Sequence, residues 1–562
     1  MIRLRGLTIA ERNRSLASVG IGLATVVGLL LLANAAWRLS ATYDEVTYLE
    51  VASRWWLSGN QDAITRMGSP LTFWKIQQAP ILWLLQALGC QALIDGPIEF
   101  QSTLLPLMRI ASLWIWVLAL WVTAIWARSL YGLKASLLAA WIFALSPNVL
   151  AHGSLITMEM PLITAATAAF WLFSRFLVTG RRSLFVVSAL AAGLAFACKF
   201  TAVLMPALIA IPWWIQQHSL HKSRPLASVW HVLKGLLLYG ILMLATDGLL
   251  TAGATIPPSE SRGEHPALLE KLGPRLGGWL SGLAESAWPQ DWVAFATQMR
   301  HQRNGGPSYL LGERRNYGWL AYYPIALAVK VPLAVAVLAL LRLGLRTRTD
   351  YQPAGRMLQI IPVVFLGLAM MGSTRNYGVR YLLLVAPPTI VWLSALATAR
   401  GWPKILGWIG VGLLATTTFN NQPNSLSYFN ELAGGPVGGR LFLADSNLDW
   451  GQGARELANL QQRHPEYQDL TTYYFGSTNP GWYGVLGIRH VVDAGEEHPG
   501  LPAALECTSK YLAVSTSLQW GPWGPTGYFQ TLNHHAPVLI LPGATMAIYQ
   551  SSDLVAADPA KP

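Results

Sequence analysis

Apolar stretches of about 20 residues, the length of a membrane-crossing helix, recur over the first three quarters of the chain and constrain its fold most. The sequence predicts about eleven spans, at 17–37, 105–127, 133–151, 155–174, 184–198, 200–217, 230–250, 321–341, 357–372, 379–398 and 404–419. The stretches 184–198 and 200–217 also fit one hairpin with a re-entrant turn. Charged residues make up only 12% of the chain, against roughly 25% in soluble domains. We therefore expect a polytopic α-helical membrane protein.

Basic residues gather in every second connection between these stretches. With the N-terminus inside, the inward connections are 1–16, 128–134, 175–183, 218–229, 342–356 and 399–404, and they hold seventeen Lys and Arg residues against Glu11 and Asp350. Because cytoplasmic connections are enriched in Lys and Arg, we expect a multi-pass protein of the cytoplasmic membrane with its N-terminus in the cytoplasm. This orientation explains the net charge of +12, which therefore does not indicate a nucleic-acid partner.

Three outward segments are too long to be simple turns. Residues 38–104 contain PILWLLQAL (80–88), which is typical of a helix lying in the membrane interface. Residues 251–320 are rich in Gly and Pro, and residues 420–562 form an extracytoplasmic tail. In the tail, residues 439–447, 510–518 and 536–542 favour strands, and residues 453–463 favour a helix. We expect a transmembrane domain over 1–419 and a small α/β domain over 420–562.

Two adjacent carboxylates, Asp44 and Glu45, follow the first span in the segment ATYDEVTYL (41–49). Neighbouring carboxylates at a membrane surface repel each other and face a low dielectric, which can tune one of them as a general base. The same spacing fits a structural role, with Thr42 or Asp44 as the N-cap of a helix and acids in its first turn. The spacing supports both interpretations equally.

A third carboxylate, Glu159, is expected within the first turns of a membrane helix, in the segment HGSLITMEMP (152–161). An ionisable residue at that depth is a functional hypothesis by default, and the alternative is a partner of the helix dipole near the outer surface. His152 in the same segment is a weaker candidate, because such a histidine is more often interfacial than a ligand.

Basic residues also occur on the outward side, where the orientation rule does not require them. Lys199, Arg375 and Arg380 lie in short outward turns, and Arg314 and Arg315 end the long outward loop. Cations there suit a phosphate or pyrophosphate, and the alternative is contact with lipid headgroups or with carboxylates of the tail. Carboxylates facing cations at a membrane surface suit sugar transfer from a lipid phosphate, with a carboxylate as base and cations on the departing phosphate.

Asp445 and Asp449 lie in the tail segment DSNLDWGQ (445–452), where a strand is expected to end in a loop. Two Asp residues in such a loop suit a site that contacts the acceptor if the tail covers the membrane part. The alternative is a cap of the helix that begins near Gly451.

Several segments resemble the membrane glycosyltransferases of the protein O-mannosyltransferase type, glycosyltransferase family 39, which have the GT-C fold. The aminoarabinose transferases that modify lipid A belong to the same superfamily. The resembling segments include the acidic pair, SPNVLAHGSLITMEMP (146–161), GLAFACKFTAVLMP (193–206), GVRYLLLVAPP (378–388) and, as the most specific, SYFNELAGGPVGGRLFLADSNLDWGQGARELANL (427–460). The resemblance covers essentially the whole membrane part and implies a GT-C fold with about eleven transmembrane helices.

The resemblance also implies roles for residues. Asp44 would be the catalytic base or bind the acceptor, with Glu45 in support, and Glu159 stands where the family usually has Asp. Lys199, Arg375 and Arg380 would bind the lipid phosphate. Aminoarabinose-transferase relatives carry Lys-Pro-Pro in the interfacial segment, whereas this chain has QQAP at 77–80, with Lys75 nearby as a further phosphate candidate. Some relatives are thought to hold a divalent metal ion and others none, so the resemblance leaves the metal requirement open.

The resulting expectation is an inverting glycosyltransferase that moves a hexose or pentose from a polyprenyl-phosphate carrier. The acceptor would be a glycan, lipid or protein on the outer face of the cytoplasmic membrane. The alternatives are a protein O-mannosyltransferase acting on Ser or Thr and, in another class, a transporter or flippase of lipid-linked sugar. Transporters usually have related halves and interrupted helices near mid-membrane, whereas the charged residues here gather at the outer edge.

Overall fold

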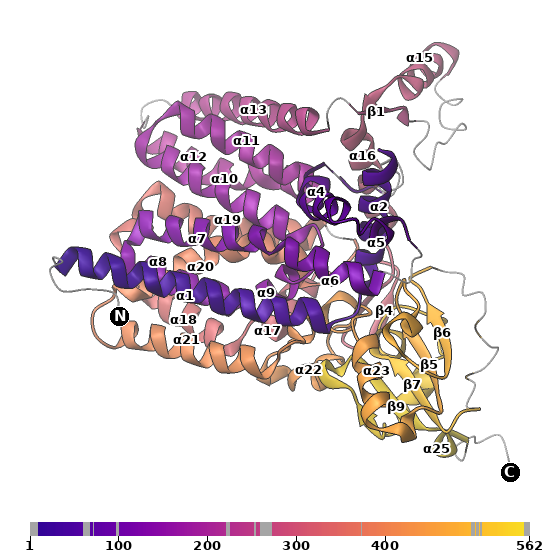
Figure 1. Ribbon diagram of the computed structural model, residues 1–562. Coiled ribbons are helices and arrows are strands. Elements are labelled where there is room, and N and C mark those ends of the chain that lie inside the picture. The colour runs from indigo at the N-terminus through magenta and orange to yellow at the C-terminus, as the bar shows by residue number, and fades with distance from the viewer. Residues whose placement is uncertain are drawn as a thin grey trace.

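The computed structural model describes residues 9–59, 68–70, 72–96, 101–220, 225–251, 254–258, 273–372, 374–495, 501, 505 and 508–555. Long helices from the first three quarters of the chain run side by side as a bundle, and the C-terminal residues form a small domain at one end of it (Figure 1). Helix α1 (Ile9–Arg38) begins at the opposite end of the bundle (Figure 1). The described chain therefore consists of a helical bundle and a smaller C-terminal domain at one end of it.

Within the described residues, seven segments are long and apolar enough to cross a membrane. They are Ser15–Arg38 in α1 (Ile9–Arg38), Ser102–Tyr131 across α6 (Gln101–Ala111) and α7 (Leu113–Tyr131), α10 (Glu159–Thr179), Phe200–Leu220 across η2 (Phe200–Leu204) and α12 (Met205–Leu220), α13 (Pro225–Leu250), α19 (Pro353–Gly372), and Val379–Thr398 across η5 (Val379–Val385), α20 (Ala386–Ser394) and η6 (Ala395–Thr398).

Two bent helix pairs raise this number to nine. Helix α11 (Arg182–Cys198) is apolar but shorter, and α21 (Trp402–Asn420) lies beside α18 (Leu333–Gly344) without meeting the same criteria. The polytopic helical membrane fold expected from the sequence is confirmed. The expected number of eleven spans is not, since the described residues give seven to nine.

Proline explains both bends. Helices α8 (Leu133–Ala144) and α9 (Pro147–Gly153) meet at 65°, and α17 (Tyr322–Lys330) and α18 (Leu333–Gly344) meet at 106°. Pro147 begins α9 and Pro332 directly precedes α18. Proline lacks a backbone N–H and disfavours the helical conformation of the residue before it. The expected spans 133–151 and 321–341 are therefore each broken into two helices.

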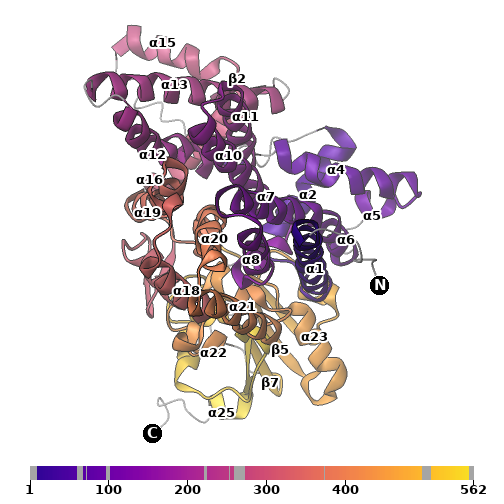
Figure 2. The ribbon, with the colours of Figure 1, turned by 90° about the vertical axis from the view of Figure 1, so that its left-hand side faces the viewer.

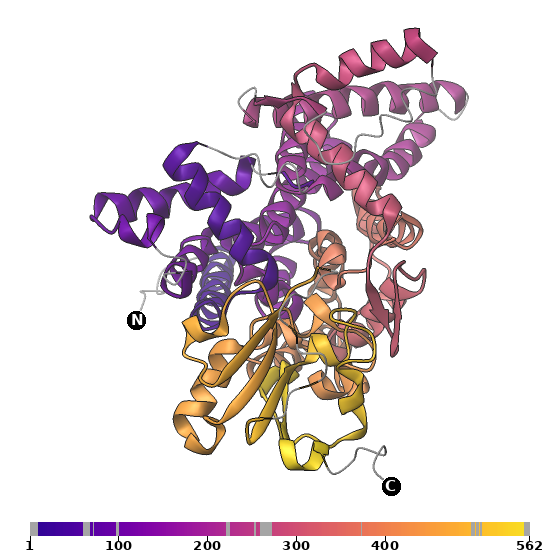
Figure 3. The same ribbon diagram turned by 90° about the vertical axis from the view of Figure 1, so that its right-hand side faces the viewer.

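The two segments that are expected to face outward before the C-terminal tail cover part of one end of the bundle. Helices α2 (Tyr43–Ser58), α4 (Thr72–Ala87) and α5 (Ala92–Asp95) pack with α6 around a small apolar core. The expected interfacial helix forms the second half of α4, where Trp83 is 62% exposed. The other outward segment contains β1 (Thr255–Ile256) paired with β2 (Trp288–Pro289), α15 (Gly273–Glu285), α16 (Gln290–Asn304), and the hairpin β3 (Ser308–Leu310) and β4 (Glu313–Arg315). Figure 3 shows both segments beside the C-terminal domain.

The C-terminal domain contains a five-stranded sheet of order β6-β5-β7-β9-β8. Its strands are β5 (Leu470–Phe475), β6 (Ile488–Val492), β7 (Tyr511–Ser515), β8 (Leu539–Ile540) and β9 (Met546–Gln550), and its helices are α22 (Gly435–Gly439), α23 (Ala454–Arg463), α24 (Thr516–Gln519) and α25 (Ser551–Val555). Strand β5 pairs in parallel with β6 and β7, whereas β9 pairs antiparallel with β7 and β8. The expected α/β tail is thus confirmed.

One expected strand of the tail, over residues 439–447, is absent. This stretch forms turns and the 3-10 helix η9 (Asp445–Asn447). Its backbone groups bond locally and to other segments: the Leu443 N–H donates to Gly439 O, and Phe442 O accepts from Leu311 N–H of the outward hairpin. Shorter 3-10 turns complete the described chain: η4 (Arg348–Tyr351), η7 (Ser425–Ser427), η8 (Glu431–Ala433), η10 (Pro465–Tyr467), η11 (Pro480–Tyr483), η12 (Gln530–His534) and η13 (Pro542–Ala544).

Candidate functional site

The adjacent carboxylates of α2 have different partners. Glu45 is fully buried, and its Oε2 accepts from the Thr42 backbone N–H at 3.0 Å and the Thr42 hydroxyl at 2.9 Å. Arg109 of α6 pairs with both Glu45 oxygens, and the Ile156 N–H donates to Oε1 at 3.0 Å. The capping role considered for this segment thus describes Glu45 in the structure. Glu45 joins α2, α6 and the segment before α10.

Asp44 instead faces the helix ends at the side of the bundle that carries the C-terminal domain. Its Oδ2 lies 2.9 Å from Nη1 of Arg380, which lies 3.8 Å from Oε1 of Glu159. That Glu159 oxygen also accepts from the Lys199 ammonium at 2.7 Å. We call Asp44, Glu159, Lys199 and Arg380 the charge cluster. It brings together two carboxylates and two cations from four separate elements.

Helix ends place two members of the charge cluster. Glu159 is the first residue of α10, and Lys199 is the extended residue that follows α11. An acid at a helix N-terminus and a base at a C-terminus are both favoured by the helix dipole. The helix-dipole explanation considered for Glu159 therefore applies, and it is compatible with a chemical role because the carboxylate faces Arg380.

The C-terminal domain places Arg380. Gly378 precedes η5 with φ +108°, and a Cβ there would lie 2.6 Å from the Ser446 hydroxyl oxygen, so a side chain does not fit. The Val379 N–H donates to Asn447 Oδ1 at 2.9 Å, and the Ser446 hydroxyl donates to Tyr377 O. The loop of the C-terminal domain is therefore part of the support of the charge cluster.

Aromatic rings line the charge cluster. The Arg380 guanidinium lies 4.2 Å from the ring centroid of Trp450, and the Lys199 ammonium lies 4.3 Å from that of Tyr381. Tyr48 of α2 is buried nearby, and burial together with the negative charges of Asp44 and Glu159 raises the pKa of its hydroxyl well above the usual value. Tyr48 is therefore neutral at physiological pH, and its hydroxyl can donate a hydrogen bond.

The tail segment 445–452 lies against this cluster, and its two Asp residues differ. Asp445 has φ +57° and accepts from the Trp523 indole N–H at 2.9 Å. Burial raises the pKa of Asp445, and the nearby charge of Arg380 opposes this rise. Asp449 accepts from the N–H groups of Gly451 and Ser517 at 3.1 Å each. Asp445 thus interacts with the cluster electrostatically, whereas Asp449 organises the loop itself.

Hydrogen bonds fasten this loop to the membrane part. The Tyr43 N–H donates to Trp450 O at 2.8 Å, and Tyr43 directly precedes Asp44 in the sequence. Lys330 at the end of α17 donates to Asn447 O at 2.6 Å and to Leu426 O at 2.9 Å, and it is only 1% exposed. The Lys330 amine therefore does not reach toward the membrane surface. The C-terminal domain covers the end of the bundle where the charge cluster lies.

Three further candidates, His152, Arg375 and Lys75, are not members of the charge cluster. His152 in α9 is buried, interacts electrostatically with Glu159 and Arg380, and its Nδ1 has no hydrogen-bond partner among the described residues. Arg375 donates from Nε to Gly305 O at 2.6 Å, in the outward loop. Lys75 belongs to α4, but its side chain lies outside the described residues. Of the four predicted phosphate ligands, the structure places Lys199 and Arg380 in the cluster.

Two residues near the charge cluster, Arg109 and Trp450, were not predicted from the sequence. Arg109 lies at the start of a long apolar segment, and a charge in that position is itself a signal of a buried partner. Trp450 lies in the tail segment, and nothing in the sequence shows that it meets Arg380. Among the described residues, no group of three or more His, Cys, Asp or Glu side chains is placed to hold a metal ion.

Part of the chain matches a known family. Residues 100–246 match the model of the family described as dolichyl-phosphate-mannose-protein mannosyltransferase, and this range includes Glu159 and Lys199. The match confirms the resemblance to the protein O-mannosyltransferase type over this segment. No curated protein sequence matches the chain significantly.

The chain is also similar in arrangement to solved structures. ArnT from Cupriavidus metallidurans bound to undecaprenyl phosphate has a TM-score of 0.49 at 13% identity, over 96% of this chain and 98% of that chain. The apo state of that ArnT gives 0.47 at 14% identity, over 96% and 99%. AglB from Archaeoglobus fulgidus, in complex with an inhibitory peptide and a dolichol-phosphate, gives 0.44 at 12%, over 90% and 70%.

Proposed function

We propose that this chain is an inverting glycosyltransferase of the cytoplasmic membrane that uses a polyprenyl-phosphate sugar as donor. The observation that supports this proposal best is the charge cluster, in which an accessible carboxylate stands beside two cations at one end of a membrane bundle. The family match over residues 100–246 supports the same class. The expected topology puts this end of the bundle, and the C-terminal domain, on the outer face of the membrane.

Exposure distinguishes the carboxylates. The side chain of Asp44 is 29% exposed, whereas those of Glu159 and Glu45 are 3% and 0% exposed. Only Asp44 among these three is open enough to meet an acceptor hydroxyl. We therefore assign it as the general base, with Glu159 as the residue that holds Lys199 and Arg380 in position. Glu45 maintains the fold of α2 through Arg109.

The charges of the cluster suggest how substrate activates it. Asp44 and Glu159 together balance Lys199 and Arg380, so an incoming phosphate competes with Asp44 for the Arg380 guanidinium. Guanidinium binds phosphate through paired hydrogen bonds. A phosphate that draws Arg380 away leaves the Asp44 carboxylate free to accept a proton. The base would thus become available when the donor is bound.

The reaction then follows from these positions. Asp44 takes the proton of an acceptor hydroxyl group. In the same step, the acceptor oxygen attacks the anomeric carbon of the sugar from the face opposite the phosphate. The bond from that carbon to the phosphate oxygen breaks, and its electron pair stays on the phosphate. Arg380 and Lys199 stabilise the developing charge on the phosphate. Attack from the opposite face inverts the anomeric configuration.

We propose that the acceptor is a hydroxyl group of a protein, glycan or lipid in the cell envelope. The test uses purified protein in detergent, labelled polyprenyl-phosphate sugars and an envelope extract as acceptor source. Release of free polyprenyl phosphate, with label appearing in an envelope product, supports transfer, and the product identifies sugar and acceptor. Movement of the labelled lipid across a vesicle membrane without release of its phosphate refutes the proposal in favour of transport.

A further inference from the structure

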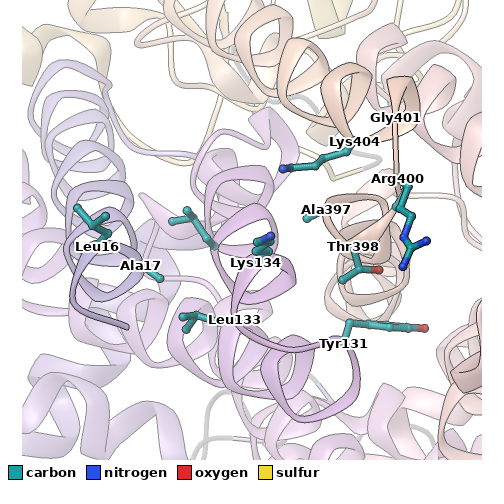
Figure 4. Close-up of a pocket in the computed structure, with 12 residues that line it drawn as sticks. Leu16, Ala17, Tyr131, Leu133, Lys134, Ala397, Thr398, Arg400, Gly401 and Lys404 are labelled. Atoms are coloured by element: carbon teal, nitrogen blue, oxygen red, sulfur yellow. The ribbon is translucent and has the colours of Figure 1, made fainter. Parts of the chain in front are cut away.

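A cavity of about 830 Å³ lies at the end of the bundle opposite the charge cluster. Figure 4 shows Lys134, Arg400 and Lys404 around it, together with apolar side chains that include Leu16 and Leu133. This is the end at which the inward connections carry the excess of basic residues, so it is expected to lie at the cytoplasmic surface. The proposed sugar-transfer site makes no use of this cavity.

Among the described residues, the three cations of this cavity have no acidic partner. None of them forms an ion pair within the described part of the chain. The nearby Asp350 is already neutralised, because it pairs with Arg342 at 2.5 Å and accepts from the hydroxyl of the cavity residue Tyr131 at 3.4 Å. The cavity therefore carries a net positive charge that an anion would balance.

Two helices add to this positive charge. Helix α8 begins at Leu133 and α21 at Trp402, so both N-termini point their unpaired N–H groups toward this end. Each helix follows a glycine with positive φ, which is +87° at Gly132 and +71° at Gly401. These two turns set Lys134 and Arg400 beside the cavity.

The helices α1 and α21, which supply Leu16, Ala17 and Lys404 to the cavity, also carry exposed apolar side chains. Helix α8 packs against both α1 and α21, and Figure 2 shows the three helices next to one another when the bundle is viewed from this end. Along α1, Val19 and Leu23 are each 54% exposed, and along α21, Ile405 and Ile409 are 60% and 50% exposed. A cationic pocket beside helices with exposed apolar side chains is complementary to a molecule with an anionic head and hydrocarbon chains. A soluble phosphate would use only the pocket.

We propose that this cavity binds the headgroup of an anionic phospholipid of the cytoplasmic leaflet, with its acyl chains along α1 and α21. Lys134, Arg400 and Lys404 would hold the phosphate. Each basic residue near an anionic membrane surface contributes about a fivefold gain in affinity. Loss of all three is therefore expected to weaken binding of the lipid about a hundredfold.

The test measures lipid binding to the purified full-length protein by native mass spectrometry, with phosphatidylglycerol and phosphatidylcholine as probes. The variant is Lys134→Gln/Arg400→Gln/Lys404→Gln. The matched control, Arg175→Gln/Arg181→Gln/Arg182→Gln, removes the same charge from exposed residues of another inward connection. Gel filtration checks that both variants remain monodisperse. If the triple cavity variant is not monodisperse, the single variant Lys134→Gln replaces it.

The proposal predicts that wild type retains phosphatidylglycerol in preference to phosphatidylcholine, and that the cavity variant loses this preference while the control keeps it. Equal losses in both variants would show a diffuse effect of basic residues and would overturn the proposal. Displacement of the lipid by glycerol phosphate at comparable concentration would identify a site for soluble anions and would overturn it as well.

Discussion

Replacing Glu45 by Gln is expected to destabilise the protein far more than replacing its neighbour Asp44 by Asn. Glu45→Gln leaves the fully buried Arg109 cation without a carboxylate, and breaking a buried pair in this way costs about 3–5 kcal/mol. Asp44 is partly exposed, and its partner Arg380 retains Glu159 at 3.8 Å. The change Asp44→Asn is therefore expected to cost about 1 kcal/mol or less.

Thermal unfolding in detergent, followed as loss of monodisperse protein, measures this difference. For a chain of 562 residues, Glu45→Gln should lower Tm by about 3–4 °C, whereas Asp44→Asn should lower it by less than about 1 °C. The matched control is Glu50→Gln on the same helix, where the pair with Arg54 is exposed and Tm should not change. If Glu45→Gln and Glu50→Gln have the same Tm, the structural role of Glu45 is wrong.

Three further changes separate the proposed roles. Arg380→Lys keeps the charge but loses the paired donors, so the KM for donor should rise about tenfold, whereas Arg375→Lys should change it less than about threefold; equal effects would contradict the assignment. Gly378→Ala forces a side chain into a positive φ and should cost about 1–3 kcal/mol, seen as a lower Tm, while Gly412→Ala on an open helix face should be neutral. Burial raises the pKa of Asp449 to about 7 from 3.8, so the unfolded chain loses this proton at lower pH than the folded protein does. The stability that this proton contributes is complete below about pH 4 and is lost as the pH rises to about 7. Asp449→Asn should therefore flatten the fall of Tm between about pH 5 and pH 8, and an unchanged slope would show that Asp449 does not titrate in this range.

Much of the fold and site follows from the sequence because apolar length and charge are local properties. Apolar length predicts the bundle, and strand-like and helix-like runs predict the α/β tail. Charged residues at the ends of apolar stretches indicate the four members of the charge cluster. The two helix breaks were not predicted, although Pro147 and Pro332 are visible in the sequence. Their effect depends on whether neighbouring helices can satisfy the interrupted backbone bonds.

Tertiary contacts account for what the sequence left open. Asp44 and Glu45 are adjacent, and only the position of Arg109 on α6 decides which of them is buried. Trp450 reaches Arg380 because the chain returns across the bundle end after the last membrane helix. The stretch 439–447 has the composition of a strand, yet its backbone groups bond to turns and to the outward hairpin. None of these three long-range contacts is visible in a local sequence pattern.

The most direct test of the proposed mechanism compares donor binding and single-turnover transfer in wild type and Asp44→Asn. If Asp44 is the base, the variant should bind the polyprenyl-phosphate sugar within about threefold of wild type and transfer it about 10²–10⁴-fold more slowly. A transfer rate within about tenfold of wild type would contradict the assignment of Asp44 as the base.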